Sequence, residues 1–337
     1  MAMTPATNRK LRTWSQFGDV KRKPTPYEAV TGKFHYHFRR EPAPFEMDPH
    51  TPLNLWYLKN REGSAFQVDD WEQFRDPFKL TYRDYVAMQH EREIFVDGMI
   101  DRAEASNHAA TLSPEWVAAL ADVLVPLRFP IHVLQMVSLY VGQMAPSSYI
   151  TNCAHFQAAD QMRRIQRIAY WTKVLDNAHG GDIASTERSR QIWESDPAWQ
   201  PLRKALEELL ITYDWGEAFT ALNVVLKPTL DAMFNEALSE LATQNGDAFV
   251  AELAAEFAHD SARSRDWTQA LTAYALERDP KLSEVLDGWV QKWTPVADAA
   301  VDGFAPVFSK APVPFNPATV IEKARSTRDE FIVGTSI

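Results

Sequence analysis

The sequence has a single cysteine and little glycine, and each shortage excludes a kind of site. Because Cys153 stands alone, the chain has no intrachain disulfide, thiolate zinc site or Cys-x-x-Cys redox pair. One unpaired thiol is typical of a reducing cytoplasm. The twelve glycines form neither a Gly-x-Gly-x-x-Gly run nor a Walker loop, so a phosphate-binding loop of the usual kind is absent.

Long hydrophobic runs and metal motifs are also missing from the sequence. We find no signal-peptide core and no apolar run near the roughly 18 to 20 residues that span a bilayer. We therefore expect a soluble, cytoplasmic protein that binds no membrane. The nine histidines give no His-Glu-x-x-His zinc motif.

One Glu-x-x-His pair is present, formed by Glu256 and His259. A carboxylate-bridged di-iron bundle needs two such pairs on separate helices and two further glutamates. We therefore interpret this pair as a chance occurrence on the surface of a helix. We expect no metal ligand, cofactor or catalytic residue in this chain.

Charge is distributed unevenly along the chain. The formal net charge is −10, yet the first 40 residues hold nine Lys or Arg against Asp19 and Glu28, so the remainder carries −17. Aromatic side chains alternate with these cations. Nucleic-acid-binding segments and transit peptides share parts of this pattern, but the acidic body opposes nucleic acid, and the many aromatics and prolines do not suit a transit peptide. We expect an arm that packs on a neighbouring subunit or on this chain's own body.

Three parts of the chain differ in composition. Residues 1–78 are rich in proline and aromatics without a helical period, which predicts an extended arm packed on a partner subunit. Residues 79–303 have the spacing of long amphipathic helices, and residues 147–178 predict one helix of about 48 Å. Residues 304–337 contain four prolines and predict an extended tail on a surface. The expected fold is therefore an all-α bundle of long helices.

Two groups of polar residues stand out in the helical part. Paired carboxylates such as Asp214 and Glu217 can act as acid and base, but a buried network that locks helices together is the commoner use. The network that we predict comprises Asp214, Glu217, Asn223 and Lys227. Arg163, Arg164 and Arg167 form a basic stripe, which we interpret as a solvated or salt-bridged face, with docking of an acidic partner as the alternative.

Several sequence blocks resemble one protein family in consistent order over residues 11–298. They include Arg12-Thr13-Trp14-Ser15, Pro52-Leu53-Asn54-Leu55-Trp56-Tyr57, Gln143-Met144-Ala145-Pro146-Ser147 and Asp214-Trp215-Gly216-Glu217-Ala218-Phe219. These blocks resemble the beta subunit of the hydroxylase component of bacterial multicomponent di-iron monooxygenases. The branch that they resemble most is that of the toluene, alkene and isoprene monooxygenases.

The resemblance implies a ferritin-like fold and a structural, non-catalytic role. In this family the alpha subunit holds the di-iron centre, activates dioxygen and oxidises the hydrocarbon, whereas beta resembles alpha in fold but lacks the ligands. The resemblance also implies gamma subunits and a second αβγ protomer. Electrons come from NADH through a reductase and a Rieske-type ferredoxin, and an effector protein regulates alpha.

Aromatic side chains commonly anchor obligate interfaces. We therefore expect anchors against alpha among Trp14, Tyr36, Trp56, Tyr57 and Trp71. Two other readings remain open. One is an autonomous di-iron oxidase that uses Glu256 and His259 with unrecognised ligands, and the other is a stand-alone helical adaptor.

Overall fold

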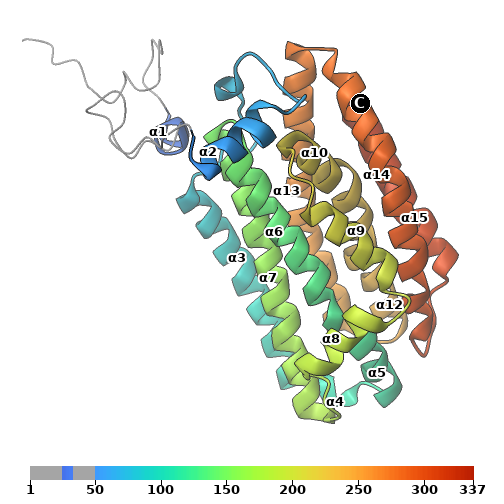
Figure 1. The fold of residues 1–337 in the computed structure, drawn as a ribbon. Coiled ribbons are helices and arrows are strands. Elements are labelled where there is room, and N and C mark those ends of the chain that lie inside the picture. Colours follow the sequence, from blue (N-terminus) through green and yellow to red (C-terminus); the bar gives the residue numbers. More distant parts are fainter. Residues whose placement is uncertain (1–24, 33–49) are drawn as a thin grey trace, which may run out of the picture.

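The computed structural model of the chain describes residues 25–32 and 50–337. Two of the predicted anchors, Trp14 and Tyr36, lie outside these residues. Within them the regular structure is helical and there is no strand (Figure 1). The prediction of an all-α fold is therefore confirmed.

Four long helical segments form the central bundle. They are α6 (Arg128–Met144), α7 (Ser148–His179), α13 (Ala248–Arg278) and a segment of five consecutive elements. These five are α10 (Trp215–Phe219), η6 (Thr220–Leu226), α11 (Lys227–Asp231), η7 (Ala232–Ala237) and α12 (Leu238–Gln244). Because α7 has 32 residues, it confirms the long helix predicted from the sequence. Three further helices flank the bundle: α3 (Tyr82–Ala105), α9 (Gln200–Leu210) and α14 (Leu282–Phe304).

Local capping chemistry explains where these helices begin. The Thr81 side chain and the Asp84 carboxylate form a capping box at the start of α3. Ser147 caps α7, which ends before Gly180 with a φ of 69°. That left-handed conformation suits glycine, which has no Cβ. Pro228 does not break the helical segment that contains it, because the π-helical segments η6 and η7 lie on either side of α11 and accommodate the proline.

Shorter elements close the ends of the bundle. At its lower end in Figure 1 lie α4 (His108–Thr111), α5 (Pro114–Val123), η5 (Val125–Leu127) and α8 (Thr186–Ser195). The N-terminal part forms α1 (Pro26–Thr31), α2 (Pro52–Tyr57), η3 (Leu58–Glu62) and η4 (Trp71–Gln73). Phe66 and Phe74 are buried beside η4 in the core of this chain. This part of the predicted arm therefore packs on the chain's own body.

The C-terminal segment is helical, so the prediction of an extended tail is wrong. After η8 (Ala305–Lys310), α15 runs from Pro317 to Gly334 and packs against α11 and η7. Proline is tolerated in the first turn of a helix, where its missing N–H has no partner to lose. Pro317 occupies that position, and the Asn316 side chain caps the same turn. Buried Val320, Ala324 and Phe331 hold α15 on the bundle.

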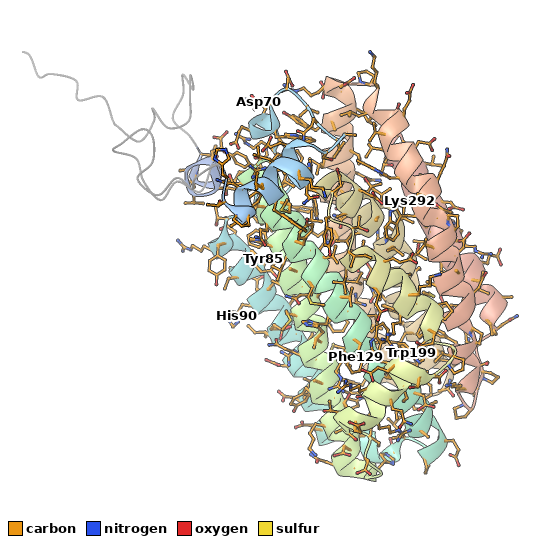
Figure 2. All side chains as sticks on the ribbon, in the orientation of Figure 1. Asp70, Tyr85, His90, Phe129, Trp199 and Lys292 are labelled. Carbon is orange, nitrogen blue, oxygen red and sulfur yellow. The ribbon has the colours of Figure 1, made fainter. Side chains whose placement is uncertain are left out.

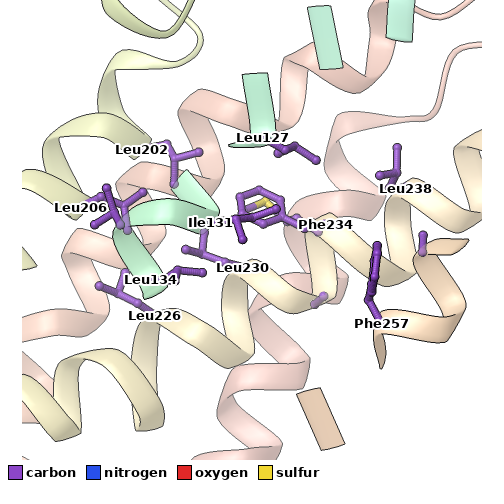
Figure 3. Packing of buried hydrophobic residues seen from close by; sticks show 14 of the residues in the cluster. Leu127, Ile131, Leu134, Leu202, Leu206, Leu226, Leu230, Phe234, Leu238 and Phe257 are labelled. Carbon is purple, nitrogen blue, oxygen red and sulfur yellow. The ribbon is translucent and has the colours of Figure 1, made fainter. Parts of the chain in front are cut away.

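The hydrophobic core is continuous between the bundle and the flanking helices. Figure 3 shows Ile131 and Leu134 of α6 meeting Leu206 of α9 and Leu230 of α11. One stretch of the described residues, Pro114–Met144, is long and apolar enough to cross a membrane, so the expectation of no such run is wrong. In the structure it forms α5, η5 and α6, and 72% of its most apolar window is buried. This stretch is therefore a core segment.

Candidate functional site

A buried group of three charged side chains lies inside the four-helix bundle, beside its apolar core. Arg164 of α7 donates to Oδ1 of Asp231 on α11 at 3.0 Å and to Oδ1 of Asn235 on η7 at 2.7 Å. Lys227, one turn before Asp231, binds the other oxygen of the same carboxylate. Asn235 donates in turn to Ser261 of α13. All five side chains are buried, so one carboxylate is held between two cations inside the bundle.

The two cations hold Asp231 in its charged form. Although burial opposes ionisation, the positive charges of Lys227 and Arg164 lower the pKa of this carboxyl. Burial lowers the pKa of Lys227, against the opposing effect of Asp231. Removing Asp231 would leave two buried cations without a counter-charge, which is strongly destabilising. The group is therefore a structural lock among α7, α11 and η7.

A second polar group lies nearer the α1 end of the bundle. The Gln157 amide donates to Ser138 of α6 and to Asn223 of η6, both at 2.9 Å, and accepts from the Trp267 indole at 3.1 Å. Trp267 and Gln157 come from α13 and α7. One amide thus joins all four helices of the bundle.

A third group joins α3 to α7 and α13 through charges. Asp160 and Asp260 both accept from the side-chain amide of Gln89 on α3, at 2.8 and 2.9 Å. Each aspartate is also paired with an arginine of the opposite helix. Arg163 of α7 donates to Asp260 at 2.8 Å, and Arg263 of α13 donates to Asp160. The arginine of each Asp-x-x-Arg motif therefore pairs with the aspartate of the other motif.

Burial and the neighbouring Asp260 raise the pKa of Asp160 to about 7. The hydroxyl of Tyr85, on the side of α3 next to α7 (Figure 2), donates to Asp160 at 2.8 Å. The charge of Asp160 is thereby tied to the position of α3. This group was not predicted from the sequence, although the Asp-x-x-Arg spacing that occurs at residues 160–163 and again at 260–263 indicates it.

The glutamate of the Glu-x-x-His pair is occupied by arginines. Glu256 is buried and accepts from Arg163 at 3.1 Å and from Arg92 at 3.3 Å, whereas His259, one turn later in α13, is exposed. The absence of a metal role for this pair stays a prediction, but its expected place on a helix surface is wrong for Glu256, which belongs to the buried charge network. Among the residues that the structure describes, no three His, Cys, Asp or Glu side chains come together to hold a metal ion.

The residues of the predicted polar network lie in separate places. Asp214 caps α10 and accepts from Ser64 at 2.7 Å. Glu217 binds Lys292 and the indole of Trp293 on α14. Asn223 and Lys227 belong to the two bundle groups already described. These four side chains therefore have different partners and do not form one site.

The basic stripe is occupied within the chain. Arg163 and Arg164 are buried and paired, and Arg167, which is partly exposed, binds Glu93 and Asp97 of α3. An acidic partner would have to displace these carboxylates. Of the two interpretations of the stripe, the structure therefore favours the salt-bridged face.

Among the predicted anchors, Trp56 and Tyr57 lie at the surface beside α6. The Trp56 indole donates to the hydroxyl of Tyr140 at 3.2 Å, and 37% of this residue is exposed. Trp71 is only 6% exposed, because Phe66, Trp215 and Tyr274 surround it. Trp71 therefore belongs to the chain's own core and has little surface to offer a partner.

Comparison with known proteins identifies relatives along nearly the whole chain. The family model described as Methane/Phenol/Alkene Hydroxylase matches residues 56–279. The hydroxylase component subunit beta of the toluene-4-monooxygenase system of Ectopseudomonas mendocina is 36% identical over 326 residues, which are 97% of this chain and 98% of the relative. The chain belongs to the methane/phenol/alkene hydroxylase family. The resemblance predicted from the sequence is therefore confirmed.

Other relatives of this hydroxylase-family chain agree with the assignment. The hydroxylase component small subunit of propane 2-monooxygenase from Gordonia sp. (strain TY-5) is 24% identical and covers 89% of this chain and 82% of its own. A solved structure of toluene 4-monooxygenase with toluene in its resting active site matches with a TM-score of 0.81 at 36% identity. That match covers 91% of this chain and 99% of the solved chain.

A di-iron centre, which ferritin-like hydroxylases hold inside their four-helix bundle, does not fit the residues of this chain. Such a centre needs inward-facing glutamates and two Glu-x-x-His motifs. The interior of the bundle carries Arg164 and Lys227, whose positive charges oppose a metal cation, and among the described residues both pair with the carboxylate of Asp231. In this hydroxylase-family chain, arginine and lysine side chains therefore neutralise the buried Asp231 carboxylate, and no metal ion is needed for that.

Proposed function

We propose that this chain is the structural beta subunit of the hydroxylase component of a cytoplasmic, multicomponent di-iron hydrocarbon monooxygenase. The observation that carries the proposal is the interior of the bundle, where Arg164, Asp231 and Lys227 form a closed ion-pair group. The iron and the hydrocarbon pocket then belong to a larger alpha subunit. The full assembly is an (αβγ)₂ hydroxylase that receives NADH-derived electrons through a Rieske-type ferredoxin and is regulated by an effector protein.

The physical role of such a subunit is to provide a rigid surface. Such a support would keep the iron-ligand geometry of alpha intact while alpha activates dioxygen and binds its effector. Three buried polar groups cross-link the helices here, centred on Arg164, Gln157 and Asp160. Satisfied networks of this kind specify one arrangement of a core. The chain therefore supports the fold of alpha and does not take part in the oxidation itself.

The test is native mass spectrometry of the tagged, full-length chain captured gently from its source cells, with iron measured on the same sample. We expect a complex that contains two copies each of this chain, a larger iron-bearing chain and a small third chain. A 38.4 kDa species carrying iron by itself would support an autonomous oxidase and overturn the proposal. The same species without iron or partners would support a stand-alone adaptor.

A further inference from the structure

The outer face of the α6 and α7 pair carries no charged side chain over most of its length. Residues 129–144 of α6 and residues 148–159 of α7 contain no Asp, Glu, Lys or Arg. The exposed positions of this face are His132, Met136, Leu139 and Gln143 on α6, and His155, Ala159, Met162 and Gln166 on α7. We call this surface the uncharged face.

A helix of a monomeric soluble protein ordinarily places charged residues on its outer side. The adjacent helix α9 follows this rule, because it exposes Lys204 and Glu207. On the uncharged face, Leu139 is 40% and Met162 37% exposed. Depletion of charge together with exposed methionine is the composition found at the centre of protein interfaces.

The exposed residues follow the spacing of a helix-packing seam. Both rows advance by four, three and four residues, which is the 3.5-residue repeat of helices that pack nearly in parallel. The two rows lie close together, because α6 and α7 are antiparallel neighbours (Figure 1). A Cβ atom on Gly142 of α6 would lie 2.6 Å from the ring of His155 on α7. The two helices are therefore in close contact here, and their exposed rows form one continuous surface.

The predicted anchors extend this face at the α2 end. Tyr57 accepts from Gln143 of α6 at 3.5 Å, and Trp56 binds Tyr140. Exposed Leu53, Leu55 and Leu58 continue the apolar surface over α2 and η3. The extension matters because of the area that it adds. Helix α6 is about 25 Å long, and two adjacent helices, each about 10 Å wide, offer a surface on the order of 500 Å². Stable interfaces bury about 800 Å² per partner.

We propose that the uncharged face, with Trp56 and Tyr57 at its end, is the docking surface for a pair of helices of the larger hydroxylase subunit. This inference rests on the proposed function. The bound helices carry apolar and uncharged polar side chains in their own 3.5-residue seam, because an unpaired charge facing these residues would lose its water without a partner.

A second copy of this chain fits the surface less well. Residues 41–337 carry a formal net charge of −17, so two bodies brought together would repel each other. A partner chain carries no such restriction. We therefore assign the larger subunit as the partner of this face, and self-association is one outcome that the test can detect.

The test introduces a charge into the uncharged face of the tagged chain in its source cells. Leu139→Lys should reduce the amount of larger subunit recovered with the chain at least tenfold. The matched control is Val333→Lys on α15, where the residue is 77% exposed, and its recovery should stay within twofold of the unchanged chain. Equal recovery with Leu139→Lys and the unchanged chain would overturn the inference.

A photo-crosslinking side chain at position 139 or at position 333 tests the same contact without a charge. The expected product is a crosslink from position 139, and not from position 333, to the larger subunit. A crosslink from 139 to a second copy of this chain would replace the partner assignment by a homodimer. Where even the unchanged chain recovers no larger subunit, the proposed function fails instead, so the two failures are distinguishable.

Discussion

Asp160 of α7 and Asp260 of α13 share two donors, the Gln89 amide and the Arg263 guanidinium. Two carboxylates this close disfavour each other's ionisation, and burial adds to that cost, so the pKa of Asp160 is raised to about 7. A folded-state pKa above the unfolded value of about 3.9 means that the native state binds the extra proton between these pH values. Stability from this group is therefore lost as pH rises from about 4 to 7.

Asp160→Asn removes this titration. We expect the difference in unfolding free energy between the unchanged chain and the variant to shrink as pH rises from 4 toward 7 and to stay constant above that. Urea titrations at four pH values measure it. A difference that stays constant over this range would show that Asp160 is ionised throughout, with its charge held by Arg263.

Replacing the buried Arg164 should lower the unfolding free energy far more than replacing an exposed cation. Arg164→Met leaves Asn235 without its donor and Asp231 with Lys227 alone. The variant loses these two buried hydrogen bonds from a charged donor, each worth about 1.5 to 3 kcal/mol, and should cost about 3 kcal/mol or more. The matched control is Lys204→Met, whose pair with Glu208 is exposed and contributes less than about 1 kcal/mol. Chemical denaturation of both variants checks the ranking, and equal stability of the two would refute the lock.

Helix boundaries and family membership were predictable from the sequence, because both are written in short local patterns. Ser147 and Gly180 delimit α7 by local capping chemistry. The blocks that carry the family resemblance are also contiguous in sequence. The error at the C-terminus arose from counting prolines without their positions, since Pro317 after Asn316 marks the start of a helix.

The buried polar groups could not be assembled from the sequence, because their members come from distant helices. Asp160 and Asp260 are separated by one hundred residues, and only the packing of α3 places Gln89 between them. Aromatic identity likewise did not tell which surface covers a ring. Trp56 stays partly exposed while Trp71, fifteen residues later, is buried by its own chain.

His108 should also make stability depend on pH, but here the fold favours the charged form of the side chain, whereas it favours the neutral form of Asp160. Its Nε2 lies 3.0 Å from buried Asp247, which also accepts from the Trp116 indole and caps α13. The hydrogen bond to Asp247 raises the pKa of His108. A raised histidine pKa gives stability that is fully present below the unfolded value of about 6.5 and is lost as pH rises through the folded value.

We therefore expect His108→Gln to cost stability at pH 5.5 and to cost less at pH 8.5, as measured by thermal unfolding in each buffer. Trp116→Phe, which removes a second side-chain donor to Asp247 without a titrating group, serves as the control and should cost the same at both pH values. A cost of His108→Gln that did not change with pH would mean that the neutral imidazole makes the bond equally well.

Gly216 and Gly288 form a matched pair for testing how closely the N-terminal segment packs on the bundle. A Cβ atom on Gly216, in α10, would lie 2.5 Å from the Cβ of Phe66, whereas one on Gly288, in α14, would meet nothing within 4 Å. Both residues are helical, so alanine gains about 1 kcal/mol of helix propensity at either position. At Gly216 the clash outweighs this gain, because overpacking a core costs about 1 to 3 kcal/mol.

Gly288→Ala should therefore raise the melting temperature of the chain and Gly216→Ala should lower it. Since Phe66 belongs to the segment that joins η3 to η4, Gly216→Ala should also open this segment to limited proteolysis between residues 58 and 74. Stabilisation by both substitutions would mean that the segment is free to move away from α10. In that case Trp71, which packs on Trp215, would return to the set of side chains that can reach a partner.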